Sequence, residues 1–103
     1  MADAQSAAKA LVAGTKVKVI TPGDPPPWSE WDDDKGRTGP PVKKRLQAQF
    51  FRGDPKIAAE ILYIANESER DELRKKGRVK VRLKEAAGSM IVITADAGNL
   101  QKR

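Results

Sequence analysis

Residues 77–100 read GRVKVRLKEAAGSMIVITADAGNL and contain the strongest pattern in the chain. After Gly77, valine and leucine alternate with arginine and lysine up to Lys84, which is the period of two of a strand buried on one face. A short connection ending in Gly88 leads to residues 89–94, SMIVIT, a run rich in β-branched residues. The pattern predicts a β-hairpin with one apolar face and one face that carries four positive charges.

Three further segments are predicted to be strands. Residues 14–20 repeat the alternation, with valines inward and lysines outward. Residues 42–51, VKKRLQAQFF, are interpreted as a second strand that precedes a turn. Residues 56–66 fit either a helix or a strand buried on both sides. We interpret residues 59–65 as a strand, because turn residues bracket the segment at strand length.

One short helix is expected immediately before the hairpin. Asn66 and Glu69 have the spacing of a capping box, so the helix can start at Asn66 or at Ser68. Cations occupy the expected last turn, and Gly77 suits the cap that follows. At the end of the hairpin, residues 95–100 suit a tight turn that returns Leu100 to the core.

Residues 21–41 are expected to form a long loop, because prolines and glycines interrupt them repeatedly. The loop holds Trp28 and Trp31 beside an acidic block at residues 30–34. We expect one indole ring to pack against the domain; the alternative is that a ring stacks on a base or clamps a peptide. Residues 1–13 are predicted to be an arm, helical or disordered, and residues 14–103 a single small domain.

Short strands, one long early loop, a hairpin and a turn before a final apolar residue together resemble the small Src-homology-3-like barrels. Within that group, residues 14–42 resemble the KOW motif of ribosomal and transcription-elongation proteins, with residues 25–34 as an insertion. The matching positions are Gly14, Val17, Val19, Ile20, Gly23, Asp24, Lys35, Gly36, Gly39 and Val42. The resemblance implies a mainly β fold, a small barrel of about five strands with a long early loop and one short helix. Such barrels bind RNA, DNA, peptides or protein surfaces.

Composition restricts the chemistry. The chain of 103 residues contains neither cysteine nor histidine, which removes disulfides, thiolate nucleophiles, histidine bases and most zinc sites. We therefore expect that the protein is not an enzyme and that it has no catalytic site, no metal site and no cofactor. No apolar run approaches the roughly 18 residues that span a bilayer, and the N-terminus lacks the pattern of a signal peptide. These features predict a cytoplasmic protein with no membrane partner, and they leave its oligomeric state open.

The charge indicates an anionic partner, since 20 Lys and Arg oppose 14 Asp and Glu for a net charge of +6. Residues 35–56 and 74–85 each hold seven cations and one acid, although ordinary solvated faces would also explain such blocks. We predict nucleic-acid binding, to RNA or DNA in a free or ribonucleoprotein context, through phosphate contacts. The predicted binding residues are Lys16, Lys18, Lys43, Lys44, Arg45, Arg78, Lys80, Arg82 and Lys84.

The alternative function is a protein-interaction or assembly subunit of a larger complex that binds an acidic protein surface. In this interpretation Trp28 or Trp31 lines the groove of the barrel, and the charged faces orient docking. The position of the acidic block at residues 30–34 discriminates between the two functions, because the block would repel phosphate. If the block lies on the same side as the basic strand faces, nucleic-acid binding is disfavoured.

Overall fold

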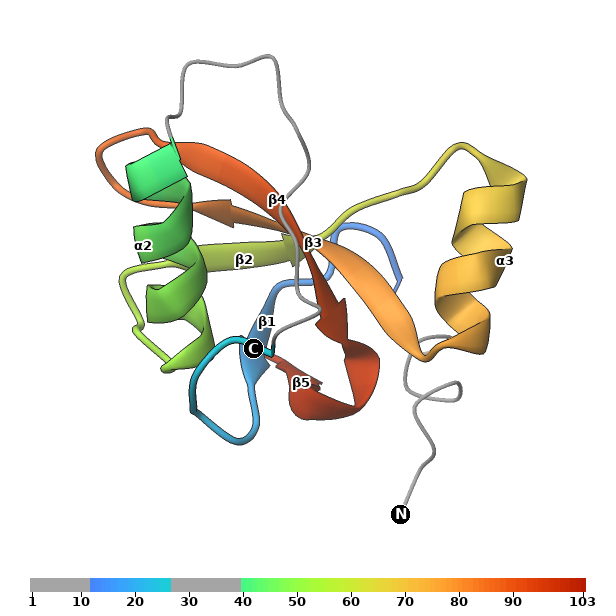
Figure 1. Ribbon diagram of the computed structural model, residues 1–103, viewed down its shortest axis with the longest axis horizontal. Coiled ribbons are helices and arrows are strands. Elements are labelled where there is room, and N and C mark those ends of the chain that lie inside the picture. The colour runs from blue at the N-terminus through green and yellow to red at the C-terminus, as the bar shows by residue number, and fades with distance from the viewer. Residues whose placement is uncertain (1–11, 27–39) are drawn as a thin grey trace.

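The computed structural model describes residues 12–26 and 40–103 (Figure 1). The predictions for Trp28, Trp31, the acidic block and most of the N-terminal arm lie outside these residues. Five strands and two α-helices are present: β1 (Val17–Val19), α2 (Pro40–Phe51), β2 (Ala58–Ile61), α3 (Glu67–Lys75), β3 (Arg78–Lys84), β4 (Met90–Asp96) and β5 (Leu100–Lys102). A 3-10 helix, Ala97–Asn99, separates the last two strands. The described residues thus form a small, mainly β domain.

The strands make two antiparallel sheets, β2–β3–β4 and β1–β5. In the larger sheet Val81 lies opposite Ile61 on one side and Ile93 on the other. An isolated bridge between Lys16 and Glu60 joins the smaller sheet to β2. Within the described residues the two sheets do not close into a barrel.

The structure confirms the predicted hairpin. Its strands are β3 and β4, and the connection is tightened by two hydrogen bonds between backbone groups. The amide of Glu85 donates to the carbonyl of Ser89 at 3.0 Å, and the amide of Gly88 donates to the carbonyl of Glu85 at 2.9 Å. Gly88 has φ +100°, a conformation that side chains with a Cβ atom rarely adopt, which explains glycine at this position.

The predicted short helix is also confirmed as α3. Asn66 is its N-cap, and the side-chain oxygen accepts a hydrogen bond from the amide of Glu69 at 2.9 Å. After α3 the chain turns at Gly77, where φ is +69°. At the far end of the hairpin, the 3-10 helix forms the predicted tight turn, and Leu100 is buried.

Residues 42–51 form most of α2, so the strand predicted there is wrong, and the described residues contain two α-helices where one was expected. Val42, Leu46 and Phe50 lie four residues apart and therefore share one face of a helix. Two prolines open the helix, where their missing amide donors are not needed. Gly53, with φ +80°, allows the chain to leave the helix.

The strand predicted at residues 59–65 is right only for its first half. β2 ends at Ile61, and the chain then leaves the sheet. Tyr63 is 70% exposed, so the expected burial on both sides is wrong at this residue. Among the described residues, no helix combines the length and the apolar character required to cross a membrane.

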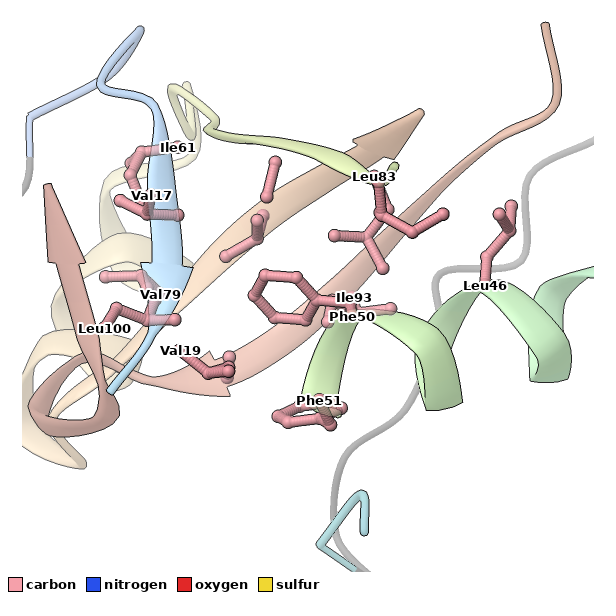
Figure 2. Close-up of a cluster of buried hydrophobic side chains, with 14 of the residues drawn as sticks. Val17, Val19, Leu46, Phe50, Phe51, Ile61, Val79, Leu83, Ile93 and Leu100 are labelled. Atoms are coloured by element: carbon pink, nitrogen blue, oxygen red, sulfur yellow. The ribbon is translucent and has the colours of Figure 1, made fainter. Parts of the chain in front are cut away.

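The hydrophobic core lies between the two sheets and α2, which contacts β1, β3 and β4. Figure 2 shows Leu46, Phe50 and Phe51 extending from α2 toward the side chains of the strands. The two phenylalanine rings meet edge to face, with centroids 5.2 Å apart. The helix therefore covers the sheet surface that the short β1–β5 pair leaves open. α3 lies at the opposite end of the molecule, beside the start of β3 (Figure 1).

Candidate nucleic-acid interface

The predicted binding residues of the strands can form one basic surface only if the strands that carry Lys16 and Arg82 are neighbours. They are not, because β2 lies between them and places Glu60 opposite both residues. The guanidinium of Arg82 donates a hydrogen bond to the carboxylate of Glu60 and forms an ion pair with it. The centre of the predicted surface is therefore partly neutralised.

The other outward cations of β3 lie in different surroundings. Arg78 pairs with Asp96 at a long distance of 3.9 Å between nitrogen and oxygen. Lys80 is half-buried on the same face, whereas Lys84 is exposed and lies opposite Ala58 and Met90. Lys18 is exposed on β1, opposite Gln101. The outer face of the sheet is thus a mixture of cations, acids and apolar groups.

The run Lys43, Lys44 and Arg45 does not extend this face, because consecutive residues of a helix diverge by about 100°. Lys43 is only 6% exposed, whereas Lys44 and Arg45 are exposed. Arg45 donates two hydrogen bonds to the carboxylate of Glu85, at 2.8 and 3.0 Å. This forked pair ties α2 to the turn of the hairpin.

The hydrogen bond from Arg45 holds the pKa of the Glu85 carboxyl below its usual range, and a hydrogen bond with Ser89 acts in the same direction. The same hydrogen bond, which Arg45 donates to Glu85, raises the pKa of the Arg45 guanidinium. The pKa of Glu85 is lower in the folded state than in the unfolded state. The pair therefore stabilises the fold at pH values above the unfolded-state pKa of about 4.3. The stabilisation is lost as the pH falls through the folded-state pKa.

The variant Glu85→Gln is therefore expected to unfold at a lower urea concentration than the wild type at pH about 7, with a smaller difference at pH about 3, below the unfolded-state pKa. Urea denaturation followed by circular dichroism measures both midpoints. Glu72→Gln is the matched control, because Glu72 is exposed and lies 3.9 Å from Lys76. It should change the midpoint little at either pH. An equal loss for Glu85→Gln at both pH values would contradict the role assigned to its charge.

A cleft of about 360 Å³ lies between α3, the segment that follows β2, and β3. Its apolar lining includes Leu62, Ile64 and Leu73. Its other main side chains are Tyr63, Arg70, Arg74, Arg78 and Lys80. Among the described residues that line the cleft, every ionisable side chain apart from the Tyr63 phenol is a cation. This arrangement is complementary to an anion rather than to another cation.

Local sequence explains how these side chains converge. The amide of Leu62 donates to the carbonyl of Lys80 at 3.0 Å, which fixes the chain after β2 against β3. On α3, Arg70, Leu73 and Arg74 are three and four residues apart, so they share one helix face. The turn at Gly77 then reverses the chain, so that β3 follows directly beside this face.

Asp71 of α3 pairs with one cation of the cleft, but only weakly. Asp71 approaches Arg74 only to 3.9 Å, and both side chains are about half exposed. Exposed pairs of this kind are weak, typically about 0–1 kcal/mol, so the guanidinium of Arg74 can exchange its partner for a phosphate.

The cleft contains two of the predicted residues, Arg78 and Lys80, and three that the sequence interpretation missed. Arg70 and Arg74 had a usable signal, because they are four residues apart on a predicted helix. No signal in the sequence indicates the exposure of Tyr63, because it depends on the residue at which β2 ends. The chemical role of the cleft has to be inferred from these residues, because comparisons with protein-family models, curated proteins and solved structures find no match.

Proposed function

We propose that the protein binds nucleic acid, RNA or DNA, through the cleft between α3 and β3. The observation that carries this proposal is the convergence of four cations in the cleft, Arg70, Arg74, Arg78 and Lys80. None of the described residues that line the cleft is acidic. Contacts from Lys and Arg to phosphates supply most of the affinity in non-specific nucleic-acid binding. The net charge of +6 on the whole chain favours the approach of a polyanion.

A second basic depression supports the proposal by extending the cationic surface. It is more open to solvent than the cleft, is lined by Lys16, Lys102 and Arg103, and shares Ala13 with the cleft. The backbone amide of Arg103 donates to the carbonyl of Lys16 at 2.9 Å, so these cations are held on one edge of the β1–β5 sheet. A nucleic-acid strand that leaves the cleft past Ala13 would meet further positive charge there.

We also infer a Src-homology-3-like arrangement of the strands. It is supported by the antiparallel order β2–β3–β4, by the pairing of β1 with β5, and by the tight turn before the last strand. The KOW-like part of the resemblance stays a prediction, because Lys35 and Gly39 lie outside the described residues and Val42 lies on α2. Barrels of this kind have many partners, so the cleft rather than the fold supports nucleic acid.

The test is binding of labelled single-stranded and duplex RNA and DNA, followed by fluorescence anisotropy at about 50 and about 200 mM salt. We expect micromolar or tighter binding that weakens steeply with salt. The double variant Arg74→Glu, Lys80→Glu should weaken binding roughly 10- to 100-fold, because each lost phosphate contact removes one counterion-release contribution.

The matched control is Lys44→Glu, Arg52→Glu. Both residues are exposed, they lie on α2 or directly after it, at the opposite end of the molecule from α3, and their reversal changes the net charge equally. The control should lose much less affinity than the cleft variant. Equal losses would show that only net charge matters, and no binding at low salt would refute the proposal. Tight binding of polyglutamate in place of the oligonucleotides would identify an acidic protein surface as the partner.

A further inference from the structure

Tyr63 is the aromatic residue that the described part of the chain leaves on the surface. Its exposed fraction is 70%, whereas Phe50 and Phe51 are 4% and 5% exposed and belong to the core. Tyr63 lines the cleft together with the cations. Because it adds little to the core, its place in the cleft calls for another explanation.

The backbone that carries Tyr63 is held in position, although its side chain is exposed. On one side, the amide of Leu62 is bonded to the carbonyl of Lys80 on β3. On the other side, the carbonyl of Ile64 accepts a hydrogen bond from the guanidinium of Arg70 at 3.2 Å. The guanidinium carbon of Arg70 also lies over the ring, 5.9 Å from its centroid. Because the backbone on both sides is fixed and Arg70 contacts the ring, less conformational entropy is lost when a ligand packs on Tyr63 than on a residue of a free loop.

We infer that Tyr63 stacks on an unpaired base and that the nucleic acid bound in the cleft is single-stranded. This inference rests on the proposed function, since the cations of the cleft have to hold the phosphates. Proteins that bind single strands combine a positive groove for the backbone with aromatic rings on which bases stack. Arg74, Arg78 and Lys80 supply the positive groove, and Tyr63 supplies the ring.

The chemistry explains why a duplex is the poorer ligand. In a duplex the face of each internal base is covered by its neighbours, so a ring on the wall of a cleft cannot reach it without unstacking. A single strand presents base faces at no such cost. Since every base has such a face in both RNA and DNA, the ring selects the strandedness rather than the sequence.

The test compares Tyr63→Ala with the wild type, using labelled oligouridine and oligothymidine of about ten nucleotides and hairpin duplexes of RNA and DNA. We expect Tyr63→Ala to bind the single strands about 5- to 150-fold more weakly. Its affinity for duplexes and the slope of log K against log salt should stay unchanged, because the phosphate contacts remain. Tyr63→Phe keeps the ring and should restore single-strand binding.

Ile20→Ala is the matched control, because Ile20 is an exposed apolar residue that follows β1 and does not line the cleft. Thermal melts of all variants establish that the fold is intact. If Tyr63→Ala binds single strands as the wild type does, while reversal of Arg74 and Lys80 abolishes binding, the stacking role is wrong and the proposed function stands. Equal losses of affinity for single strands and duplexes in Tyr63→Ala would also overturn the stacking role. If the wild type binds no nucleic acid, both proposals fail.

Discussion

Val81→Asp is expected to leave the chain unfolded in buffer without denaturant. Val81 lies in the middle of β3, is 0% exposed, and faces Ile61 and Ile93 across the sheet. An unpaired carboxylate at this position costs several kcal/mol, in addition to the apolar contacts that the valine made. A small domain has a total stability of only about 5–15 kcal/mol, so the loss is comparable to the whole.

Lys84→Asp is the matched control for this prediction. It introduces the same residue into the same strand, but at an exposed position on the outer side of the sheet. It should shift the melting temperature by only a few degrees. Circular dichroism and thermal denaturation distinguish the two variants. A cooperative melt of Val81→Asp close to that of the wild type, or a Lys84→Asp variant that fails to fold, would show that the two faces of β3 are assigned incorrectly.

Leu46→Ala is expected to destabilise the fold by about 2–5 kcal/mol. Leu46 is 0% exposed and belongs to the face of α2 that covers the core. Its removal costs the transfer free energy of the deleted atoms and leaves a cavity, because α2 is also held by Phe50, Phe51 and the forked pair of Arg45 with Glu85. Urea denaturation measures the change in the free energy of unfolding.

The neighbouring residue Lys44 provides the control for α2. Its side chain is exposed on the helix, so Lys44→Ala should change the free energy of unfolding by less than about 0.5 kcal/mol. A strand through residues 42–51 would place Lys44 on the same side as Leu46. In that arrangement the substitution of Lys44 would remove a buried charge and affect stability strongly, which would contradict the helix.

The parts of the fold that could be predicted from the sequence are those with short-range patterns. The alternation in residues 78–84 assigns each side chain of β3 to a face, and Asn66 with Glu69 identifies the start of α3. In both cases the residues that determine the structure are close together in the chain. The same holds for the tight turn that returns Leu100 to the core.

The strand predicted at residues 42–51 is wrong because the apolar spacing of α2 fits both a strand and a helix. A separation of four residues, as between Val42, Leu46 and Phe50, is two repeats of a strand and about one turn of a helix. Only the residues between these three distinguish a strand from a helix. Lys44 would point inward in a strand, whereas it is exposed on the helix. The two prolines at the start of α2 were a second signal, since proline is favoured in a first helical turn.

The candidate site depends on contacts that no local pattern specifies. The insertion of β2 between β1 and β3 brings Glu60 against Arg82, 22 positions away in the chain, and divides the predicted basic surface. The exposure of Tyr63 depends on the position at which β2 leaves the sheet. Amino-acid composition correctly indicates an excess of cations, but the order of the strands determines which of them face the same ligand.

The most direct test of the binding site is a map of backbone amide chemical shifts in the protein labelled with nitrogen-15, recorded while a single-stranded oligonucleotide is added. Binding in the cleft predicts that the largest changes occur at Leu62, Tyr63, Arg74 and Lys80, with smaller ones at Lys16 and Arg103. Amides around Lys44, on α2, should stay unchanged. Saturable changes confined to α2 or to the hairpin turn, with the cleft unaffected, would contradict the proposed site.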